Sequence, residues 1–469
     1  MFAHVDMNSY FASVEQQANP HWRGRPLGVC AYLHKHGCVI AASIEAKKRG
    51  AKVGMSVDEC RQVCPDMVFV QNDPPKYRAV TSRVFSLLHQ ISDKVEHYSI
   101  DEAFLDLDGW YRDAAEAAWA LCRARIRIQQ EIGDWLKCSI GIAPSKFLAK
   151  LASDLKKPNG LVIITLENLD ETLAILELED ACGIGRHIKR RLNRLGIYTL
   201  LDLKHYPVAN LMQVLGKAGW TWHERLCGHD VDRLEVAGER LPKSVGHSFC
   251  VPRRANEQGL ILPIAVRLTE RAGRRLRSFG LFARSMNIQI GFRETSGKTQ
   301  NPSFFHPFDN GETCSMAFGE PANDIFSLTH GATELLKNVW DGQRQVSFLA
   351  VTLIDLVPPS GQTALPLSFV IPAKAGIHPP SVISTAVSTS ERSGEIVVNQ
   401  DSSTALRFAR NDRGEMRERS FEASRAVDVI RDRYGDESIV FANMIKLGTD
   451  YAPDRIGFRK TEGVDVTGN

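Results

Sequence analysis

The sequence predicts an α+β protein of several domains, and three observations lead to that class. The chain has 469 residues, too many for one hydrophobic core, since a domain commonly holds about 100 to 200 residues. Strand-like apolar runs are interspersed with segments of helical periodicity along most of its length. Hydrophobic residues make up 43% of the chain and charged residues 24%, a composition typical of a soluble globular protein.

The first predicted elements lie at the N-terminus. The apolar run FAHVD predicts a strand that ends at Asp6, and the following MNSYFASVEQQ has the helical spacing of Tyr10, Phe11 and Val14. PLGVCAYL and GCVIAAS predict two more strands, and IEAKKRGA predicts a helix. We interpret residues 20–72 as a small subdomain inserted near the start of the first domain.

The next elements complete that domain. Residues 76–95 predict a helix, which leads into the segment YSIDEAFLDL. Residues 112–132 predict another helix, CSIGIAPS a strand, and KFLAKLASDLKK a helix that ends at PNG, a stop and turn signal. The first domain therefore extends to about residue 165.

Two further units follow. Residues 166–237 are helical and contain GIGRHIKRRLNRLGI. Residues 243–357 mix strands and helices: apolar and polar residues alternate from Met286 to Phe292, as in a half-buried strand, and AVRLTERAGRRLRSFG predicts a helix with an arginine-rich face.

The remaining residues, 358–469, form a tail of different character. Residues 368–420 are rich in Ser, Thr, Gly, Pro and Arg without a sustained period, which predicts an insertion with little packed structure. Helical pattern resumes at FEASRAVDVIRDRYGDE, where Val427, Ile430 and Tyr434 share a face. Without the insertion the tail would read QTALPLFEASRAVDVI, a continuous sequence.

Charge is unevenly distributed. Residues 181–300 hold 21 Lys and Arg against 9 Asp and Glu, a net +12, whereas the whole chain carries +3. A basic part joined to an acidic part suggests that one binds a polyanion and the other carries out cation-dependent chemistry. The alternative is a charged surface that is merely solvated.

Several features bear on location. The start of the chain lacks the basic and apolar segments of a secretion signal, and no run of about 18 apolar residues occurs, so we expect a cytoplasmic protein with no membrane partner. The ten cysteines are scattered, and CRQVC lacks the two-residue gap of a zinc site, so reduced and mostly buried thiols are expected.

Two adjacent carboxylates, Asp101 and Glu102, stand out in YSIDEAFLDL. Successive side chains of a strand point to opposite faces, but a tight turn between antiparallel strands would let both converge with Asp6. Three hard oxygen donors without His or Cys suit magnesium. Two such ions bridging substrate phosphates would activate an attacking hydroxyl and stabilise a leaving pyrophosphate. The alternative is an acidic pair solvated in a turn.

Four separated motifs carry a family resemblance. VDMNSYFASVE, YSIDEAFLDL, SIGIAPSKFLAKLASDLKKPNG and the GIG hairpin, in this order, resemble the Y-family translesion DNA polymerases of bacteria and archaea. The resemblance covers residues 1 to about 357. It implies a right-hand polymerase with the following parts: a palm (1–19 and 73–165), fingers (20–72), a helical thumb with a helix-hairpin-helix (166–237) and an α/β little finger (243–357).

The resemblance also implies an activity. Deoxynucleoside triphosphates would be added to the 3′ end of a primer on template DNA, past damaged bases, with two Mg²⁺ ions. The implied metal ligands are Asp6, Asp101, Glu102 and the backbone carbonyl of Met7.

Nucleotide-binding positions follow from the same motifs. Phe11 matches the steric gate that excludes a ribose 2′-hydroxyl, with Tyr10 supporting it, although Phe11 could also be plain core. Lys157 matches the lysine that contacts the incoming triphosphate, and its alternative is a surface charge at a helix end.

The predicted fingers depart from the commonest pattern. Ile44 and Lys47 stand where many members have a Tyr and an Arg that contact phosphates, and Ile offers no hydrogen bond. Lys48 could assist. GCVIAASIEAKKRG looks more like the polymerase V catalytic-subunit branch, so the choice between that branch and polymerase IV stays open.

DNA and clamp contacts are implied as well. The helix-hairpin-helix would use Gly183, Gly185 and Lys189 on backbone phosphate, unless it is a simple helical corner, and Lys243 and Arg284 are candidate phosphate contacts. QTALPLSF resembles a sliding-clamp motif, with these anchors: Gln362, Leu365, Leu367 and Phe369. Without the insertion the aromatic would be Phe421. The competing hypothesis is a catalytically weak, polymerase-like adaptor that binds DNA and the clamp. We expect a monomer.

Overall fold

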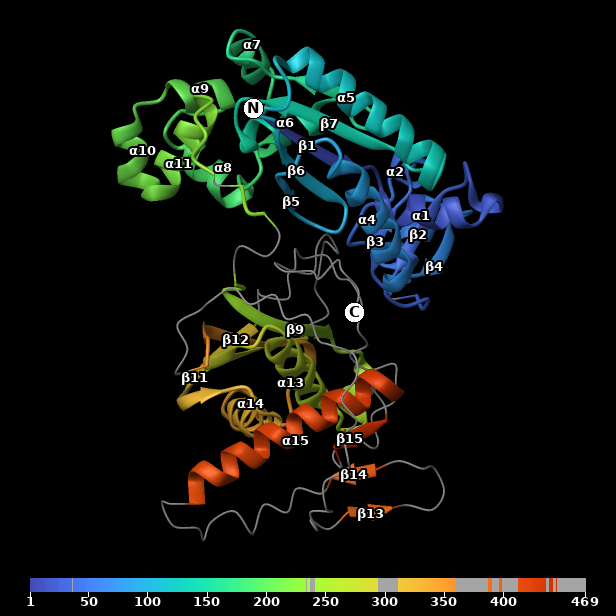
Figure 1. Cartoon of the computed structure of the whole chain (residues 1–469), viewed down its shortest axis with the longest axis vertical. Coiled ribbons are helices and arrows are strands. Elements are labelled where there is room, and N and C mark those ends of the chain that lie inside the picture. Colours follow the sequence, from blue (N-terminus) through green and yellow to red (C-terminus); the bar gives the residue numbers. More distant parts are fainter. Residues whose placement is uncertain are drawn as a thin grey trace. The chain divides into compact units, whose positions relative to one another are not determined.

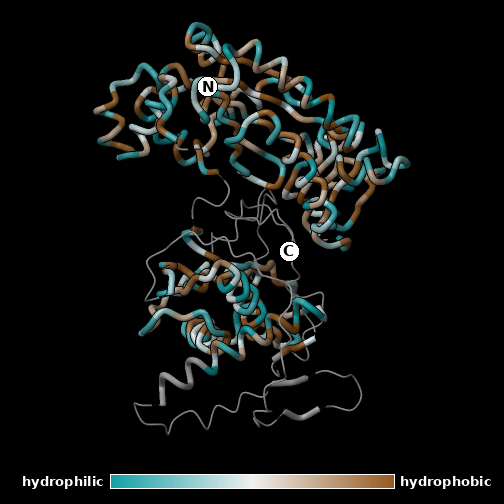
Figure 2. The backbone as a smooth tube through the Cα atoms, in the orientation of Figure 1, coloured by the Kyte–Doolittle hydropathy of each residue, from teal (hydrophilic) through white to brown (hydrophobic). Residues whose placement is uncertain are grey.

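The computed structural model describes residues 1–35, 37–232, 234–236, 241–293, 311–359, 387–389, 396–398, 412–435, 438–441 and 444 (Figure 1). These residues fall into two compact units, divided in the sequence between residues 240 and 241. Hydrophobic and hydrophilic stretches alternate along the chain in both units (Figure 2). Within the part of the chain that is described, no helix is both long and apolar enough to cross a membrane.

A five-stranded sheet forms the centre of the first unit, in the order β5-β6-β1-β7-β8. Its strands are β1 (Phe2–Met7), β5 (Val95–His97), β6 (Glu102–Asp106), β7 (Cys138–Ala143) and β8 (Leu161–Ile163). β1 lies in the middle, antiparallel to β6 and β7, and all of its residues are buried. Because β1 has neighbours on both sides, it provides a rigid base for the acid at its end.

Helices cover this sheet. α6 packs on β1 and β7, and α1 contacts α4. The helices concerned are α1 (Tyr10–Ala18), α4 (Pro74–Leu88), α5 (Ala114–Arg127) and α6 (Lys146–Leu155). α5 continues into a π-helical turn over Ile128–Ile132.

A smaller three-stranded sheet, in the order β3-β2-β4, has its own hydrophobic core. Its elements are β2 (Leu27–Cys30), β3 (Val39–Ala42), β4 (Val68–Gln71), α2 (Ile44–Lys48) and α3 (Val57–Val63), with a 3₁₀ turn, Pro20–Trp22, before them. The side chain of Ser43 accepts a hydrogen bond from the backbone N–H of Ala46, which sets the start of α2.

The rest of the first unit is a cluster of short helices whose core continues into α6. They are α7 (Leu169–Ala174), the 3₁₀ turn Leu178–Asp180, α8 (Arg186–Asn193), α9 (Leu200–His205), α10 (Val208–Leu215) and α11 (Lys217–Leu226). Thr199 and Asp202 form a reciprocal capping box at the start of α9.

The second unit is a four-stranded antiparallel sheet, in the order β11-β10-β12-β9, with helices packed on it. Its elements are β9 (Ser244–Cys250), α12 (Arg253–Glu257), α13 (Ile261–Ser278), β10 (Phe282–Phe292), β11 (Gly311–Ala322), α14 (Ile325–Val339) and β12 (Val346–Val357). The predicted alternation in β10 is present as far as Ile290. Phe292 is only half-buried, because the register shifts between Gly291 and Phe292.

The tail contains more structure than its composition predicts. α15 (Asp412–Tyr434) begins nine residues before Phe421, where the apolar pattern resumes, and the short strands β13 (Val387–Thr389), β14 (Ile396–Val398) and β15 (Ile439–Phe441) form a sheet. The predicted apolar face of the helix is present only in part, since Val427 and Ile430 are half-buried. Tyr434 is 67% exposed, whereas Ser424 and Arg431 are buried, because polar and charged contacts hold this helix.

Candidate active site

The carboxylates meet at one end of the five-stranded sheet. Asp6 lies directly opposite Glu102 in the register of β1 and β6, so both side chains belong to one face. Asp101 immediately precedes β6, and its carbonyl accepts a hydrogen bond of 2.9 Å from the N–H of Met7. The predicted turn between antiparallel strands is therefore present: Asp101 lies in it, and Glu102 is the first strand residue.

Burial disfavours the ionised form of Asp6 and of Asp101. Desolvation raises the pKa of Asp6 to about 6, with the charge of Glu102 adding to the rise and Lys157 opposing it. Desolvation and the charge of Asp6 also raise the pKa of Asp101, although a hydrogen bond from Ser99 works the other way. Each carboxylate thus disfavours ionisation of its neighbour, and a cation placed among them would relieve that repulsion.

Two lysines on and after α6 neutralise the acids. Lys157 Nζ donates to Asp6 Oδ2 at 2.6 Å and pairs with Asp154 at 2.6 Å. Lys150 Nζ forms a close ion pair with Glu102. Burial alone would lower the pKa of Lys157, but the charges and hydrogen bonds of Asp6 and Asp154 together outweigh burial and raise it.

The three acids suit magnesium chemically, although each is held by another side chain. Among the described residues no group of three or more His, Cys, Asp or Glu side chains is gathered closely enough to hold a metal ion. The reason is local: Lys157 holds Asp6, Lys150 holds Glu102, and Ser99 Oγ donates to Asp101 Oδ1 at 2.5 Å. The chemistry of the donor set nevertheless fits Mg²⁺, because the acids are hard oxygen donors that are partly buried and repel one another.

Tyr10 and Phe11 lie beside α4. The Tyr10 hydroxyl donates to the carbonyl of Tyr77 at 2.8 Å and shares a hydrogen bond of 2.8 Å with Thr81, whose hydroxyl donates to the carbonyl of Ile100. This chain of contacts ends one residue before Asp101. The Phe11 ring stacks on Tyr77 with centroids 4.4 Å apart and is 9% exposed, so Phe11 is also a core residue.

Lys47 on α2 is near enough to Asp6 and Asp101 for their charges to act on its pKa. Its surface is exposed, yet nearby protein atoms and the charge of Lys157 lower its pKa, while Asp6 and Asp101 act to raise it. Ile44, one turn earlier, is half-buried and offers no polar atom from its side chain. The smaller sheet therefore contributes one positive charge beside the acids.

The candidate DNA contacts have different environments. Gly183 has φ +98°, which favours glycine, and Gly185 precedes the first turn of α8. Lys189 pairs with Glu177 at 2.9 Å and Glu179 at 2.8 Å, so its charge is already compensated, contrary to a simple phosphate-binding role. Sequence spacing did not reveal this pairing because the two glutamates lie in the preceding turn.

Lys243 precedes β9 and Arg284 lies on β10, and both are exposed in the second unit. The clamp-like anchors Gln362, Leu365, Leu367 and Phe369 fall outside the described residues. Phe421, the aromatic of the uninterrupted motif, instead stacks on Phe282 with centroids 6.2 Å apart.

Two neighbours of the acids escaped the sequence argument. Lys150 lies seven residues before Lys157, two helical turns away, and that spacing was an available signal. His4 lies two residues before Asp6 in β1, is fully buried, has Nδ1 2.8 Å from Ser153 Oγ, and approaches Glu102 to 3.9 Å. Strand alternation from Asp6 would have found it.

The chain matches known proteins along most of its length. A model of the impB/mucB/samB family matches residues 5–154, and one of that family's C-terminal domain matches residues 242–367. DNA polymerase IV of Moorella thermoacetica is 32% identical over 355 residues, or 75% of this chain and 85% of the relative. A solved Y-family DNA polymerase chimera of Dbh and Dpo4 has a TM-score of 0.64 at 27% identity, covering 76% of this chain and 99% of that one. A Dbh ternary complex has a TM-score of 0.51 at 26% identity, with the same coverage.

Fold, motifs and relatives together define a DNA-directed DNA polymerase. The chain belongs to the Y family of these enzymes, the impB/mucB/samB family, whose function is translesion synthesis. The predicted α+β polymerase fold is confirmed.

Proposed function

We propose that this polymerase adds deoxynucleotides to a primer 3′ end at the carboxylates of β1 and β6. The observation that carries the proposal is the placement of Asp6 opposite Glu102, with Asp101 beside them and Lys157 in contact. A cluster of acids at the end of a central strand suits the transfer of a nucleotidyl group.

The domains are proposed as palm (1–19 and 73–165), fingers (20–72), thumb (166–237), little finger (243–357) and tail (358–469). The five-stranded sheet supports the first, the three-stranded sheet the second, the short helices the third and the four-stranded sheet the fourth. The acids would then belong to the palm and Lys47 to the fingers.

Asp6, Asp101, Glu102 and the carbonyl of Met7 would hold two Mg²⁺ ions. When bound, these ions lower the pKa of the attacking hydroxyl and neutralise charge on the phosphates. The protein's own part is to fix Asp6 and Glu102 on paired strands, and to hold the turn at Asp101 through Thr81 and the carbonyl of Ile100.

Lys157 and Lys47 are proposed to bind the triphosphate. A triphosphate offers Lys157 a more highly charged partner than Asp6, so nucleotide binding would draw the ammonium away and release Asp6. Lys47 supplies a single point charge, and Ile44 adds no hydrogen bond, so we expect weaker phosphate contacts than a Tyr and Arg pair would provide.

Phe11 and Tyr10 are proposed to determine sugar selectivity. Phe11, in the first turn of α1, stacks on Tyr77, and Tyr10 is anchored by Tyr77 and Thr81. A ring fixed in this way would clash with a 2′-hydroxyl without moving.

Primer-template DNA is the proposed partner, held through its backbone. Gly183 and Gly185 would present backbone amides to phosphate, while Lys243 and Arg284 would add charge in the second unit. Lys189 would contribute only after leaving Glu177 and Glu179. Clamp binding through QTALPLSF and a monomeric state belong to the same proposal.

The adaptor hypothesis has one observation in its favour, the absence of a polar side chain at Ile44. Primer extension with purified protein, Mg²⁺ and millimolar nucleotides distinguishes the two. We expect extension. Binding of primer-template without any extension would leave the adaptor as the function.

A further inference from the structure

The tail helix α15 lies against the helical layer of the second unit (Figure 1). The backbone N–H of Ile325, in the first turn of α14, donates to Ser424 Oγ at 2.9 Å, and Phe421 stacks on Phe282. Ser424 is fully buried, and its hydroxyl satisfies the N–H of Ile325, while the cap residue Asp324 accepts from the N–H of Ser327 in the same turn. α15 therefore completes α14.

Ion pairs of both senses join α13 to α15. Arg277 of α13 forms two hydrogen bonds with Asp428 of α15, at 2.6 and 2.8 Å, in a bidentate fork. One turn earlier on α13, Arg274 pairs with Asp432. Because both helices carry both signs of charge, sliding by one turn would oppose like charges, so the pairing specifies a single register.

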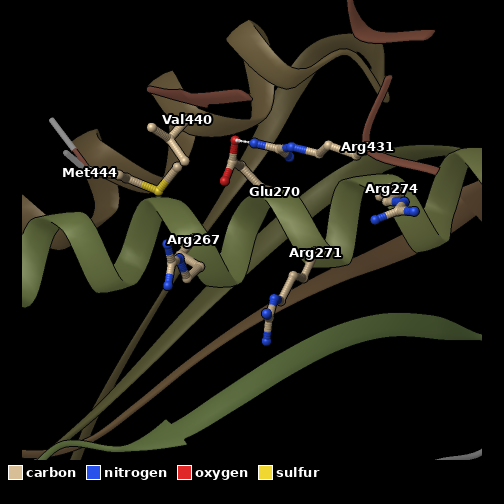
Figure 3. A pocket seen from close by; sticks show the side chains of 7 residues that line it. All are labelled: Arg267, Glu270, Arg271, Arg274, Arg431, Val440 and Met444. Atoms are coloured by element: carbon tan, nitrogen blue, oxygen red, sulfur yellow. Dashed lines mark hydrogen bonds and ion pairs between the residues drawn. The ribbon is translucent and has the colours of Figure 1, made fainter. Parts of the chain in front are cut away.

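The third pair reverses the signs and is the most buried. Glu270 of α13 accepts from Arg431 of α15 at 2.9 Å, and the two side chains are 4% and 7% exposed. Arg431 also donates twice to the carbonyl of Ile439 in β15, at 3.1 and 2.6 Å. Figure 3 shows this pair between the helices, with Val440 and Met444 beside it.

A buried pair of this kind resists separation. Replacing Arg431 while α15 stays docked would leave Glu270 buried without its partner, in a position where burial already raises its pKa. Removing one partner of a buried pair is far more costly than losing an exposed one. The contact therefore has the character of a permanent layer.

That layer covers a positively charged face. Arg267, Arg271 and Arg274 of α13 line a pocket that Arg431 and Val440 also line (Figure 3). Arg277 of α13 pairs with Asp428. A row of arginines on one helix can bind the phosphates of a nucleic acid of any base sequence. Asp428 and Asp432 occupy two of these arginines.

We propose that α15 and β15 form an integral third layer of the second unit that excludes nucleic acid from the arginine face of α13. The described residues 412–435 and 438–441 then belong to the folded polymerase and are not a dispensable tail. The nucleic-acid part rests on the proposed function, since only a DNA-binding protein needs to keep a second basic face from competing for its substrate.

A charge swap tests the docking. Arg277→Asp and Asp428→Arg should each lower the midpoint of thermal unfolding of the full chain, by about 5 °C. The double variant, Arg277→Asp with Asp428→Arg, should recover most of the loss because the pair is restored in reverse. Equal losses in the double variant and in the sum of the single variants would overturn the assignment of the register.

A binding experiment tests the exclusion of nucleic acid. The full-chain variant Asp428→Lys with Asp432→Lys is compared with Glu422→Lys with Glu257→Lys, which makes the same change in net charge at exposed positions. The probe is a blunt 20-base-pair duplex without a primer end, titrated at several salt concentrations. We expect about tenfold tighter binding and a steeper salt dependence for the first variant only. Equal binding by both variants would refute the exclusion.

Neither readout uses nucleotide addition. Loss of primer extension with an intact swap result would therefore count against the proposed active site alone. A failed swap with normal extension would count against the third layer alone.

Discussion

Ion pairs occur in two places in this molecule and differ in kind. At the acids of β1 and β6 the cations are lysines, each a single ammonium: Lys157 holds Asp6 and Lys150 holds Glu102. Between α13 and α15 the cations are arginines, and Arg277 holds Asp428 through two parallel hydrogen bonds.

This difference between lysine and arginine indicates which ion pairs can exchange partners and which are permanent. A lysine ammonium on a flexible chain can exchange one anion for another, whereas a guanidinium fork is matched to a particular carboxylate. Burial, and to a smaller extent mutual repulsion, raises the pKa of Asp6 and of Asp101, so the ionised acids of the first region are destabilised. In the second region, the ion pairs between α13 and α15 stabilise the fold.

The largest expected effect tests this division at Asp101. Asp101→Ala should lower primer extension by about 1,000-fold or more, near 4 kcal/mol of transition-state stabilisation, and leave duplex binding unchanged. Because burial disfavours the ionised carboxylate, the unfolding midpoint should not fall. Extension kinetics, filter binding and thermal melting measure the three, with Asp108→Ala as an exposed control. A simultaneous loss of folding would make Asp101 a structural residue.

Arg431 should behave in the opposite way. Arg431→Met leaves Glu270 buried without its partner and should destabilise the second unit by about 3 kcal/mol. Primer extension per folded molecule should change little. Denaturant unfolding checks the first expectation, and Arg433→Met is the matched control on the exposed side of α15. If the two variants unfold alike, the buried pair contributes nothing.

Phe11 combines both kinds of role. Phe11→Ala should admit ribonucleotides, with a loss of sugar discrimination of about 30-fold, or about 2 kcal/mol. It should also destabilise the first unit, because the ring stacks on Tyr77 in the core. Competing dNTP and rNTP incorporation measures the first effect. Unchanged discrimination would assign Phe11 to the core alone.

Arg277→Lys sharpens the comparison between the two cations. A lysine keeps the charge but replaces the fork with a single point of contact, and it also loses the hydrogen bond to the carbonyl of Asn323. The expected destabilisation is about 1 kcal/mol, measured by denaturant unfolding. No loss would mean that charge, and not geometry, holds α15.

The smallest expected effect is a pH dependence from His97. Burial, together with the charge of nearby His89, lowers the pKa of His97 from 6.5 to about 4. Between these values the unfolded chain binds the proton and the folded one does not. The contribution of His97 to the free energy of unfolding is therefore fully present above pH 6.5 and is lost as the pH falls toward 4. The loss is about 1 kcal/mol, because solvent still reaches the ring. His97→Gln should remove this decline in unfolding measured at pH 7.5 and 5.

Sequence reasoning performed best where the information is local. The turn at Asp101, the strand ending at Asp6 and the helix ending before Lys157 follow from patterns of a few residues each. It did not reveal which charged side chains meet. The pairing of Lys189 with Glu177 and Glu179 was not anticipated, and the phosphate contact of that lysine stays a prediction.

The tail shows the same limit. An apolar face through Tyr434 was a reasonable prediction, yet the helix docks through Ser424, Asp428 and Arg431. Polar residues look solvent-facing in a sequence unless their partners are known, and the partner of Arg431 lies 161 residues away.

The sequence by itself determined the family, the places of the acids on strand and turn, and the order of the elements. Strand alternation, helical spacing and turn residues act over short distances along the chain. Only the tertiary structure decided which charges meet: Lys150 with Glu102, and Arg277 with Asp428. Electrostatic pairing depends on distance in space and on burial, and neither is encoded in spacing along the chain.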